Sequence, residues 1–285
     1  MPLPSDVGRL GPGSIPDQSG SPVSLRRGIA AAGLRRAFDR AWQQAGIAVD
    51  GGNAQDPDAG HTLLALFFDL AAWRPWLHEA LSLLDDAEQA RVHRKHRPGD
   101  RDELALAYAL HRLVLGSVLG EDPAAVVLGR DAAGRPCLPG DALHTSLSHA
   151  DGFVAVAISG QGVVGIDVEL ATRAADMPAI ADHVWHPDEA KALAALPQPE
   201  QATALLRLWV RKEALLKAAG IGLSREMHSF VAPAGQPLPL PLADGGDGVV
   251  RAVVRMLDVG PAWLAALASV DGNGPQVAWL QPSDQ

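Results

Sequence analysis

The order of the predicted helices and strands constrains the fold of this chain more than any other sequence feature. An apolar run at 62–69 predicts a buried strand, and apolar side chains three and four residues apart predict a long helix over 102–119. Two strand-like segments, 153–159 and 163–170, are joined by a glycine-containing turn, and a second long helix is predicted over 202–219. This order predicts an α+β fold with two similar halves. Further strand-like segments are Phe230–Val231, Val249–Met256 and Trp263–Val270.

Length and local composition suggest how the chain is divided. Its 285 residues, 47% hydrophobic and 20% charged, suit one large globular domain or two of about 100–150 residues. The first sixty residues are rich in Gly, Pro, Ser and Asp, with a possible amphipathic helix within Leu25–Val49. A shorter helix from about Asp85 is expected to end at Pro98-Gly99. The predicted division is a loosely ordered extension at 1–60, one half at 61–150 and a second half at 151–285.

Cysteine content and charge exclude several classes of protein. Cys137 is the single cysteine, so the fold has no intramolecular disulfide and no multi-cysteine zinc site, and a reducing, cytoplasmic compartment is expected. The longest apolar run, 63–73, contains Asp69 and is shorter than the roughly 20 residues that cross a membrane. The net charge of −9 argues against general nucleic-acid binding. We therefore expect no membrane and no nucleic-acid partner.

Two carboxylates alternate along the strand-like segment 163–170. The two-residue period of a strand places Asp167 and Glu169 on one face, with Cα atoms about 7 Å apart. Like charges at this spacing repel unless a cation lies between them, and Mg²⁺ prefers carboxylate and phosphate oxygens. A solvated outer face of a strand gives the same pattern. The spacing alone therefore leaves both interpretations open.

The second long helix carries charges toward its apolar side. At about 100° per residue, Lys212 falls in the middle of the apolar stripe and Glu213 at its edge, with Lys217 one turn beyond Glu213. Burial of a charge costs several kcal/mol unless the charge is paired or bound to a metal. The pattern therefore favours a functional role. The alternative is that the Lys212 ammonium reaches solvent and that Glu213 and Lys217 form a surface pair.

Four segments carry a resemblance to a known family. Gly165–Glu169 reads GIDVE, and about forty residues later Trp209–Ala218 reads WVRKEALLKA. The two segments resemble the paired signature of the 4′-phosphopantetheinyl transferase superfamily, G-[IV]-D-[VI]-E and W-x-x-K-E-[AS]-x-x-K. Ser146–His149 and Gly134–Pro136 resemble its N-[IL]-S-H segment and G-[KR]-P turn. Size and layout resemble the surfactin-synthetase-activating (Sfp) type, over roughly 63–270.

The resemblance implies a fold and a reaction. The fold is a monomeric pseudodimer, each half a small antiparallel sheet packed on a long helix, with the active site in the cleft between the halves. The reaction is Mg²⁺-dependent transfer of 4′-phosphopantetheine from coenzyme A to a serine hydroxyl of an apo acyl, peptidyl or aryl carrier protein, which releases adenosine 3′,5′-bisphosphate. The resemblance does not indicate whether the pathway served is fatty acid, polyketide or nonribosomal peptide biosynthesis.

The resemblance also implies site residues. Asp167, Glu169 and Glu213 would bind Mg²⁺, Glu213 is also the candidate base, and Lys217 would reach the phosphates. Lys212 matches the motif, with a structural or a phosphate-binding role left open. The residues expected to bind coenzyme A are Arg101, Arg112, Arg135, Ser148, His149, Lys212 and Lys217.

Two further features bear on binding. Five Lys and Arg residues lie within 91–101, where they would bind coenzyme A phosphates or an acidic carrier, or form a solvated loop. Ser146 stands where the family usually has Asn, and we expect a weaker local hydrogen bond there. The alternative functions are a catalytically inactive carrier- or nucleotide-binding homologue and a Mg²⁺-dependent phosphohydrolase.

Overall fold

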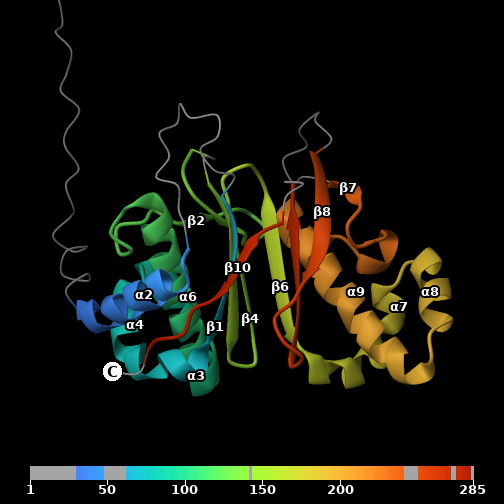
Figure 1. The fold of residues 1–285 in the computed structure, drawn as a ribbon, viewed down its shortest axis with the longest axis horizontal. Helices are drawn as coiled ribbons and strands as arrows, with labels where there is room; N and C mark the ends of the chain where they lie inside the picture. The colour runs from blue at the N-terminus through green and yellow to red at the C-terminus, as the bar shows by residue number, and fades with distance from the viewer. Residues whose placement is uncertain (1–29, 48–61, 141–142, 241–249, 271–273, 284–285) are drawn as a thin grey trace, which may run out of the picture.

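The computed structural model describes residues 30–47, 62–140, 143–240, 250–270 and 274–283, which form two sheets flanked by helices (Figure 1). The first sheet has the strand order β10-β1-β5-β4-β3-β2, and the second has the order β6-β9-β8-β7. All neighbouring strands are antiparallel except β1 and β10, which are parallel. The predicted α+β class is thereby confirmed. The strands are β1 Leu63–Asp69, β2 Gly129–Arg130, β3 Pro136–Cys137, β4 His144–Ala150, β5 Phe153–Ser159, β6 Val164–Leu170, β7 Pro237–Leu240, β8 Val250–Leu257, β9 Trp263–Ser269 and β10 Gln276–Trp279.

A long helix packs against each sheet. In Figure 1 the helices lie at the two ends of the molecule, with α6 beside the first sheet and α9 beside the second. Both long helices end at a glycine in the left-handed conformation, Gly120 and Gly220. Among the described helices, none is long and apolar enough to cross a membrane. The α-helices are α2 Ala32–Gln44, α3 Leu70–Trp73, α4 Leu77–Leu83, α5 Asp86–His93, α6 Pro98–Leu119, α7 Ala181–Val184, α8 Pro187–Ala194 and α9 Gln198–Ala219.

Pro98 starts a helix, whereas the sequence predicts that it ends one. The helix from Asp86 stops at His93, and Pro98 is the first residue of α6. Proline suits this position because the first turn of a helix needs no N–H from it. The strand predicted at Phe230–Val231 is wrong, since these described residues form no strand. The Phe230 carbonyl accepts a hydrogen bond from the Lys212 ammonium, where a strand would have a backbone N–H donor.

The two sheets share an apolar layer. Leu63, Ala65 and Phe67 of β1 and Ala155 and Ala157 of β5 form one buried cluster with side chains of the second sheet. The contributors from β6 and β9 are Val164, Ile166, Val168, Trp263, Ala265 and Leu267. The alternation of β6 thus turns its valine and isoleucine toward the first sheet, which leaves Gly165, Asp167 and Glu169 on the side of α9.

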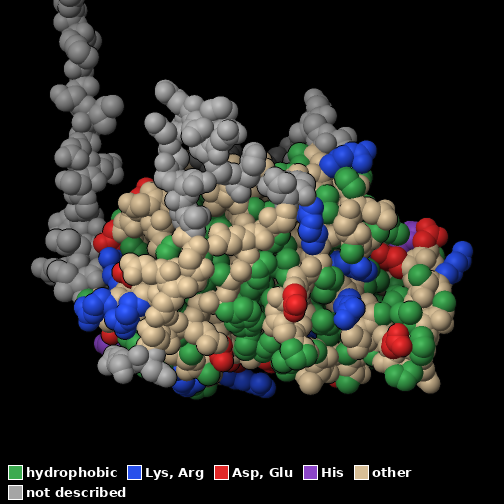
Figure 2. Space-filling view, viewed as in Figure 1, with side chains coloured by type: hydrophobic (Ala, Val, Ile, Leu, Met, Phe, Trp, Pro, Cys, Tyr) green, Lys and Arg blue, Asp and Glu red, His purple; other side chains and the backbone are tan. Residues whose placement is uncertain are grey.

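The described part of the expected N-terminal extension belongs to the core. Leu34, Ala37, Phe38 and Ala41 of α2 are buried in the cluster that α6 and the first sheet form. The loosely ordered extension predicted at 1–60 is therefore corrected for 30–47, and its other residues lie outside the described ranges. Figure 2 shows Lys and Arg side chains at the end of the molecule where α2 lies, and apolar side chains over the strands.

The change from one sheet to the other falls later in the chain than residue 150. Strand β5 pairs with β1 and β4, so the first sheet extends to Ser159, and β6 opens the second sheet at Val164. Strand β10 then returns to the first sheet beside β1. We propose that the halves meet at residues 160–163. The internal symmetry of a pseudodimer stays a prediction.

Candidate active site

Gly165 allows α9 to contact β6 directly. A Cβ atom at this position would lie 2.0 Å from the Ala214 carbonyl oxygen and 2.4 Å from the Ala218 nitrogen, and both are backbone atoms. Glycine is therefore required for the close approach of the two backbones. Because Glu213 and Lys217 precede these two alanines on α9, the contact brings them toward the carboxylates of β6.

A pocket of about 320 Å³ lies where β4, β6 and α9 meet. Ser148 and His149 enter it from the first sheet, whereas the acidic residues come from the second sheet and its helix. Both long motifs and the Ser-His segment thus contribute to one cavity. The residues that line it are Leu147, Ser148, His149, Asp167, Val168, Glu169, Trp209, Glu213 and Lys217.

Hydrogen bonds join the three elements around this pocket. The Lys217 ammonium lies 2.7 Å from Oδ1 of Asp167 and 2.8 Å from the Ser148 hydroxyl, and that hydroxyl donates to the same Asp167 oxygen at 2.9 Å. The neighbouring Ser146 accepts a hydrogen bond from the backbone N–H of Ile166 at 3.1 Å. Ser146 therefore ties β4 of the first sheet to β6 of the second sheet. The weakening expected from Ser in place of the family's Asn stays a prediction.

Burial raises the pKa of two of the three carboxylates. Burial, followed by the charge of Asp167, raises the pKa of Glu213 to about 7, and Lys217 opposes this shift. Burial also raises the pKa of Glu169, against a hydrogen bond from Arg173 at 2.5 Å. Among the described residues, Oδ2 of Asp167 and Oε2 of Glu169 are buried without a hydrogen-bond partner. Two unpaired anionic oxygens and a carboxyl group with a neutral-range pKa form a site that a cation would stabilise.

The three carboxylates share the pocket without converging on one point. Within the described ranges, no three His, Cys, Asp or Glu side chains are close enough together to hold a metal ion. The Asp167 and Glu169 oxygens that do have partners are bound to Lys217 and Arg173. The donors are nonetheless hard oxygens, which is the chemistry that Mg²⁺ requires.

Lys212 points away from the pocket, and its role is structural. Its ammonium is fully buried and donates to the carbonyls of Val184, Met227 and Phe230 at 2.6–2.8 Å. It also pairs with Glu189 at 2.6 Å. Every ammonium hydrogen thus has an acceptor inside the protein. We therefore withdraw the expected contact with a phosphate.

Arg112 is also structural. Its guanidinium is 2% exposed and pairs with Asp85 and Glu88, each at 2.5 Å. It also donates to the carbonyls of Pro123 and Val126. A guanidinium enclosed in this way cannot reach coenzyme A, so we withdraw this assignment as well.

The remaining expected binding residues lie outside the lining of the pocket. Arg135 pairs with Asp131 at 3.0 Å and donates to the Ala218 carbonyl near the end of α9. Arg101 is exposed, and its Nε donates to the Lys95 carbonyl. Lys95 and Asp100 of the same segment are close enough to His149 for their charges to act on its ring. The phosphate contacts expected of Arg101 and Arg135 stay predictions.

His149 is exposed at the edge of the pocket. Desolvation by the surrounding protein, and then the charges of Lys95 and Lys217, lower the pKa of His149, and Asp100 partly opposes them. Burial and these two cations therefore favour the neutral form of the ring. A neutral imidazole binds an anion by one N–H donor instead of by its charge.

Arg173 and Trp209 are the pocket neighbours to which our sequence reading assigned no role. Trp209 is the first residue of the second motif, so the motif already indicates its place near the pocket. Arg173 lies three residues after the end of β6. Its contact with Glu169, four residues earlier, depends on the short helix η2, Ala171–Ile180, which the sequence analysis did not predict.

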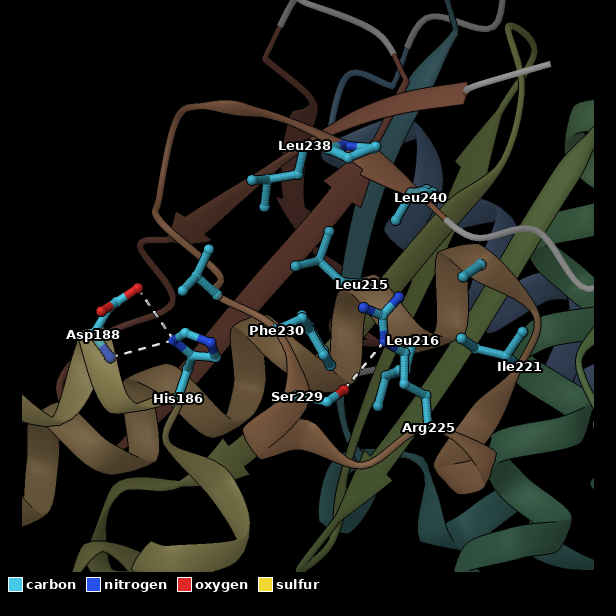
Figure 3. Close-up of a pocket in the computed structure, with 13 residues that line it drawn as sticks. His186, Asp188, Leu215, Leu216, Ile221, Arg225, Ser229, Phe230, Leu238 and Leu240 are labelled. Atoms are coloured by element: carbon cyan, nitrogen blue, oxygen red, sulfur yellow. Dashed lines mark hydrogen bonds and ion pairs between the residues drawn. The ribbon is translucent and has the colours of Figure 1, made fainter.

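A second pocket of about 340 Å³ lies on another face of α9 (Figure 3). Its described lining is mostly apolar and includes Leu215, Leu216, Phe230 and Leu238. His186 and Asp188 lie together at one side, and Arg225 is bound to Ser229 at the other (Figure 3). This pocket gathers no set of described carboxylates. The reaction chemistry is therefore assigned to the first pocket.

Comparison with known proteins agrees with the motifs. The family model for the 4′-phosphopantetheinyl transferase superfamily matches residues 163–238, which include both long motifs. The chain is 30% identical over 154 residues to "4′-phosphopantetheinyl transferase HetI" of Nostoc sp. (strain PCC 7120), a match that covers 52% of this chain and 65% of the relative. It is 28% identical over 152 residues to "4′-phosphopantetheinyl transferase Sfp" of Bacillus subtilis (strain 168), covering 53% and 66%. These matches span just under two thirds of each relative. The predicted resemblance is confirmed.

Proposed function

Because residues 163–238 match the family model of the 4′-phosphopantetheinyl transferase superfamily, we propose that the protein transfers 4′-phosphopantetheine from coenzyme A to a serine hydroxyl of an apo carrier protein. One observation carries this proposal. Asp167, Glu169, Glu213 and Lys217, from the two matched motifs, line a single pocket together with Ser148 and His149. The carrier would be an acyl, peptidyl or aryl carrier protein. We also propose a monomeric, cytoplasmic enzyme.

The proposed reaction exchanges the phosphoanhydride bond of coenzyme A for a phosphoester bond to the carrier. The serine oxygen of the carrier forms a bond to the β-phosphorus of coenzyme A, and the bond from that phosphorus to the bridging oxygen breaks. The bridging oxygen leaves with adenosine 3′,5′-bisphosphate. Glu213 would accept the serine proton as a carboxylate. Its pKa of about 7 belongs to the cation-free protein, and a bound cation would lower it.

Asp167, Glu169 and Glu213 would hold Mg²⁺. The unpaired buried oxygens of Asp167 and Glu169 and the hard donor set support this assignment. When bound, Mg²⁺ would neutralise negative charge on the diphosphate. Glu169 and Asp167 are held by β6, so their positions are fixed by the sheet before any ligand arrives.

Lys217, Ser148 and His149 would bind and orient the phosphates. Lys217 presents a compact positive charge one turn from Glu213, and its bonds to Ser148 and Asp167 fix its direction. His149 would donate a hydrogen bond from a neutral ring. Arg101 and Arg135 stay proposed contacts, whereas Arg112 and Lys212 support the fold. The exposed segment 93–101 would face coenzyme A or an acidic carrier.

Carrier modification tests this function. The protein is incubated with coenzyme A, Mg²⁺ and each of several apo carriers from fatty acid, polyketide and nonribosomal peptide systems, and the carriers are weighed by mass spectrometry. We expect the mass of phosphopantetheine to be added to at least one carrier, and relative rates to identify the preferred class. Tight coenzyme A binding with no transfer would indicate an inactive homologue. Release of free phosphopantetheine without a carrier would indicate a phosphohydrolase.

A further inference from the structure

Arg173 lies beside the carboxylate pair but belongs to neither motif. It follows Glu169 by four residues, in η2, and its Nη1 donates to Oε1 of Glu169 at 2.5 Å. The side chain of Glu169 is 11% exposed, whereas that of Arg173 is 39% exposed. The pair therefore joins a buried acid to a base that reaches it from the solvent side.

The charges around this pair are balanced in a specific way. Lys217 binds one oxygen of Asp167, and Arg173 binds one oxygen of Glu169. The second oxygen of each carboxylate is buried and has no hydrogen-bond partner among the described residues. Two side-chain cations thus partly neutralise two carboxylates, and one oxygen of each carboxylate is left without a partner among the described residues.

Arg173 is held less firmly than Lys217. Lys217 bonds to both Ser148 and Asp167 and is 27% exposed. For Arg173, the described structure contains one hydrogen bond, the one to Glu169. A long, partly exposed side chain with one partner can return its charge to water at small cost. Arg173 is therefore the cation that can leave when another takes its place.

We propose that Arg173 is a built-in counterion that occupies Glu169 when no divalent cation is bound and competes with that cation for the carboxylate. This inference rests on the cation site of the proposed function. Arg173 stabilises the cation-free protein, because it prevents Glu169 from being a buried unpaired charge, and it weakens cation binding for the same reason. Loss of Arg173 should therefore lower the stability of the cation-free protein and raise its affinity for the cation. Loss of a purely structural ion pair would lower stability without raising cation affinity.

Two measurements on Arg173→Gln test the proposal without any transfer reaction. Calorimetric titration with Mg²⁺ or Mn²⁺, in the absence of coenzyme A, is expected to give a dissociation constant about five- to tenfold lower than that of the wild type. Thermal unfolding in a chelator is expected to give a Tm about 2–4 °C lower, and the difference is expected to shrink or reverse in saturating Mg²⁺. Arg173→Lys keeps the charge, and its cation affinity and Tm are expected to lie between those of the wild type and those of Arg173→Gln.

Arg74→Gln is the matched control. It changes the net charge by the same amount and removes an exposed ion pair to Asp102, at 3.1 Å, with no part in the pocket. Its cation affinity is expected to equal that of the wild type.

The outcomes separate the two proposals. Equal or weaker cation binding by Arg173→Gln, beside saturable binding by the wild type, overturns the counterion role alone. If Arg173→Gln and Arg74→Gln gain the same cation affinity, the counterion role is also overturned, because the gain would then follow from the change in net charge alone. No saturable cation binding in the wild type and in Arg173→Gln overturns the cation site and the counterion role together.

Discussion

At the scale of single residues, burial decides which motif residues do chemistry. Lys212 and Lys217 are five positions apart on α9, yet Lys212 is fully buried against three carbonyls and Glu189, whereas Lys217 enters the pocket. The helical period predicts that Lys212 points inward. It does not reveal the acceptors, because Glu189 and the carbonyls come from other elements.

Lys212→Met is expected to destabilise the protein by about 3–5 kcal/mol, because it leaves three carbonyls without their donor and the partly buried Glu189 without its cation. Denaturant unfolding measures this loss. Lys191→Met on the exposed face of α8 is the control and is expected to change stability by less than about 0.5 kcal/mol. A loss below 1 kcal/mol for Lys212→Met would contradict the structural role, and the residue would again be a candidate for phosphate binding.

His111 makes the stability of the protein depend on pH, and it lies outside the lining of the pocket. It is fully buried on α6, with Nε2 2.7 Å from the Thr145 hydroxyl, and burial, followed by the charges of Arg130 and Arg112, lowers the pKa of His111 to about 3. A folded pKa below the unfolded value of 6.5 means that the unfolded chain binds the proton first. Stability is therefore fully present above pH 6.5 and is lost as the pH falls toward 3.

Between pH 7 and pH 4, the wild type is expected to lose about 2–3 kcal/mol more stability than His111→Gln, whose amide can bond to Thr145 without titrating. Urea unfolding at several pH values measures the two slopes. Identical slopes would contradict the burial of a neutral imidazole.

At the scale of elements, the contact between β6 and α9 builds the pocket. Both segments are predictable from sequence, since β6 alternates and α9 has a helical period, and the two motifs mark their facing sides. Their separation is not predictable from either period. It depends on Gly165, where the absence of a side chain lets the two backbones touch.

Gly165→Ala is expected to push α9 away from β6, because its Cβ would meet backbone atoms that cannot turn aside. We expect a loss of about 1–3 kcal/mol in stability and a larger proportional loss of transfer rate in the protein that remains folded. Unfolding curves and initial rates measure the two effects. Gly99→Ala is the control, since its Cβ would meet no atom within 4 Å. Activity equal to the wild type in Gly165→Ala would contradict the close contact.

At the scale of the whole molecule, long-range pairing exceeds what sequence patterns reveal. Strand β10 lies beside β1, more than two hundred residues away, and Trp73 donates to the carbonyl of Leu280 at 3.2 Å. The helix α2 and the buried Arg112 likewise join a core whose parts are distant in sequence. The order of the predicted helices and strands indicated the fold class, and the resemblance of the motifs to a known family indicated residues of the pocket. Boundaries between the halves depended on strand partners that no local period indicates.

A chain ending at Gly274 lacks β10 but keeps every residue of the pocket. It is expected to lose at least about 2 kcal/mol of stability, because Leu280 is fully buried and β1 loses a neighbouring strand. A chain that lacks only the last two residues is the control, and thermal unfolding compares the three. Unchanged stability would contradict the place of β10 in the first sheet.

The transfer reaction is the central claim, and its stoichiometry tests it most directly. Apo carrier, coenzyme A and Mg²⁺ are incubated with the protein, and the carrier mass and adenosine 3′,5′-bisphosphate are measured in the same samples. We predict one bisphosphate released for each phosphopantetheine gained, with both products lost when the carrier serine is replaced by alanine and strongly reduced in Glu213→Gln. Absence of mass gain on every carrier class, or bisphosphate release that continues without the carrier serine, would contradict the account.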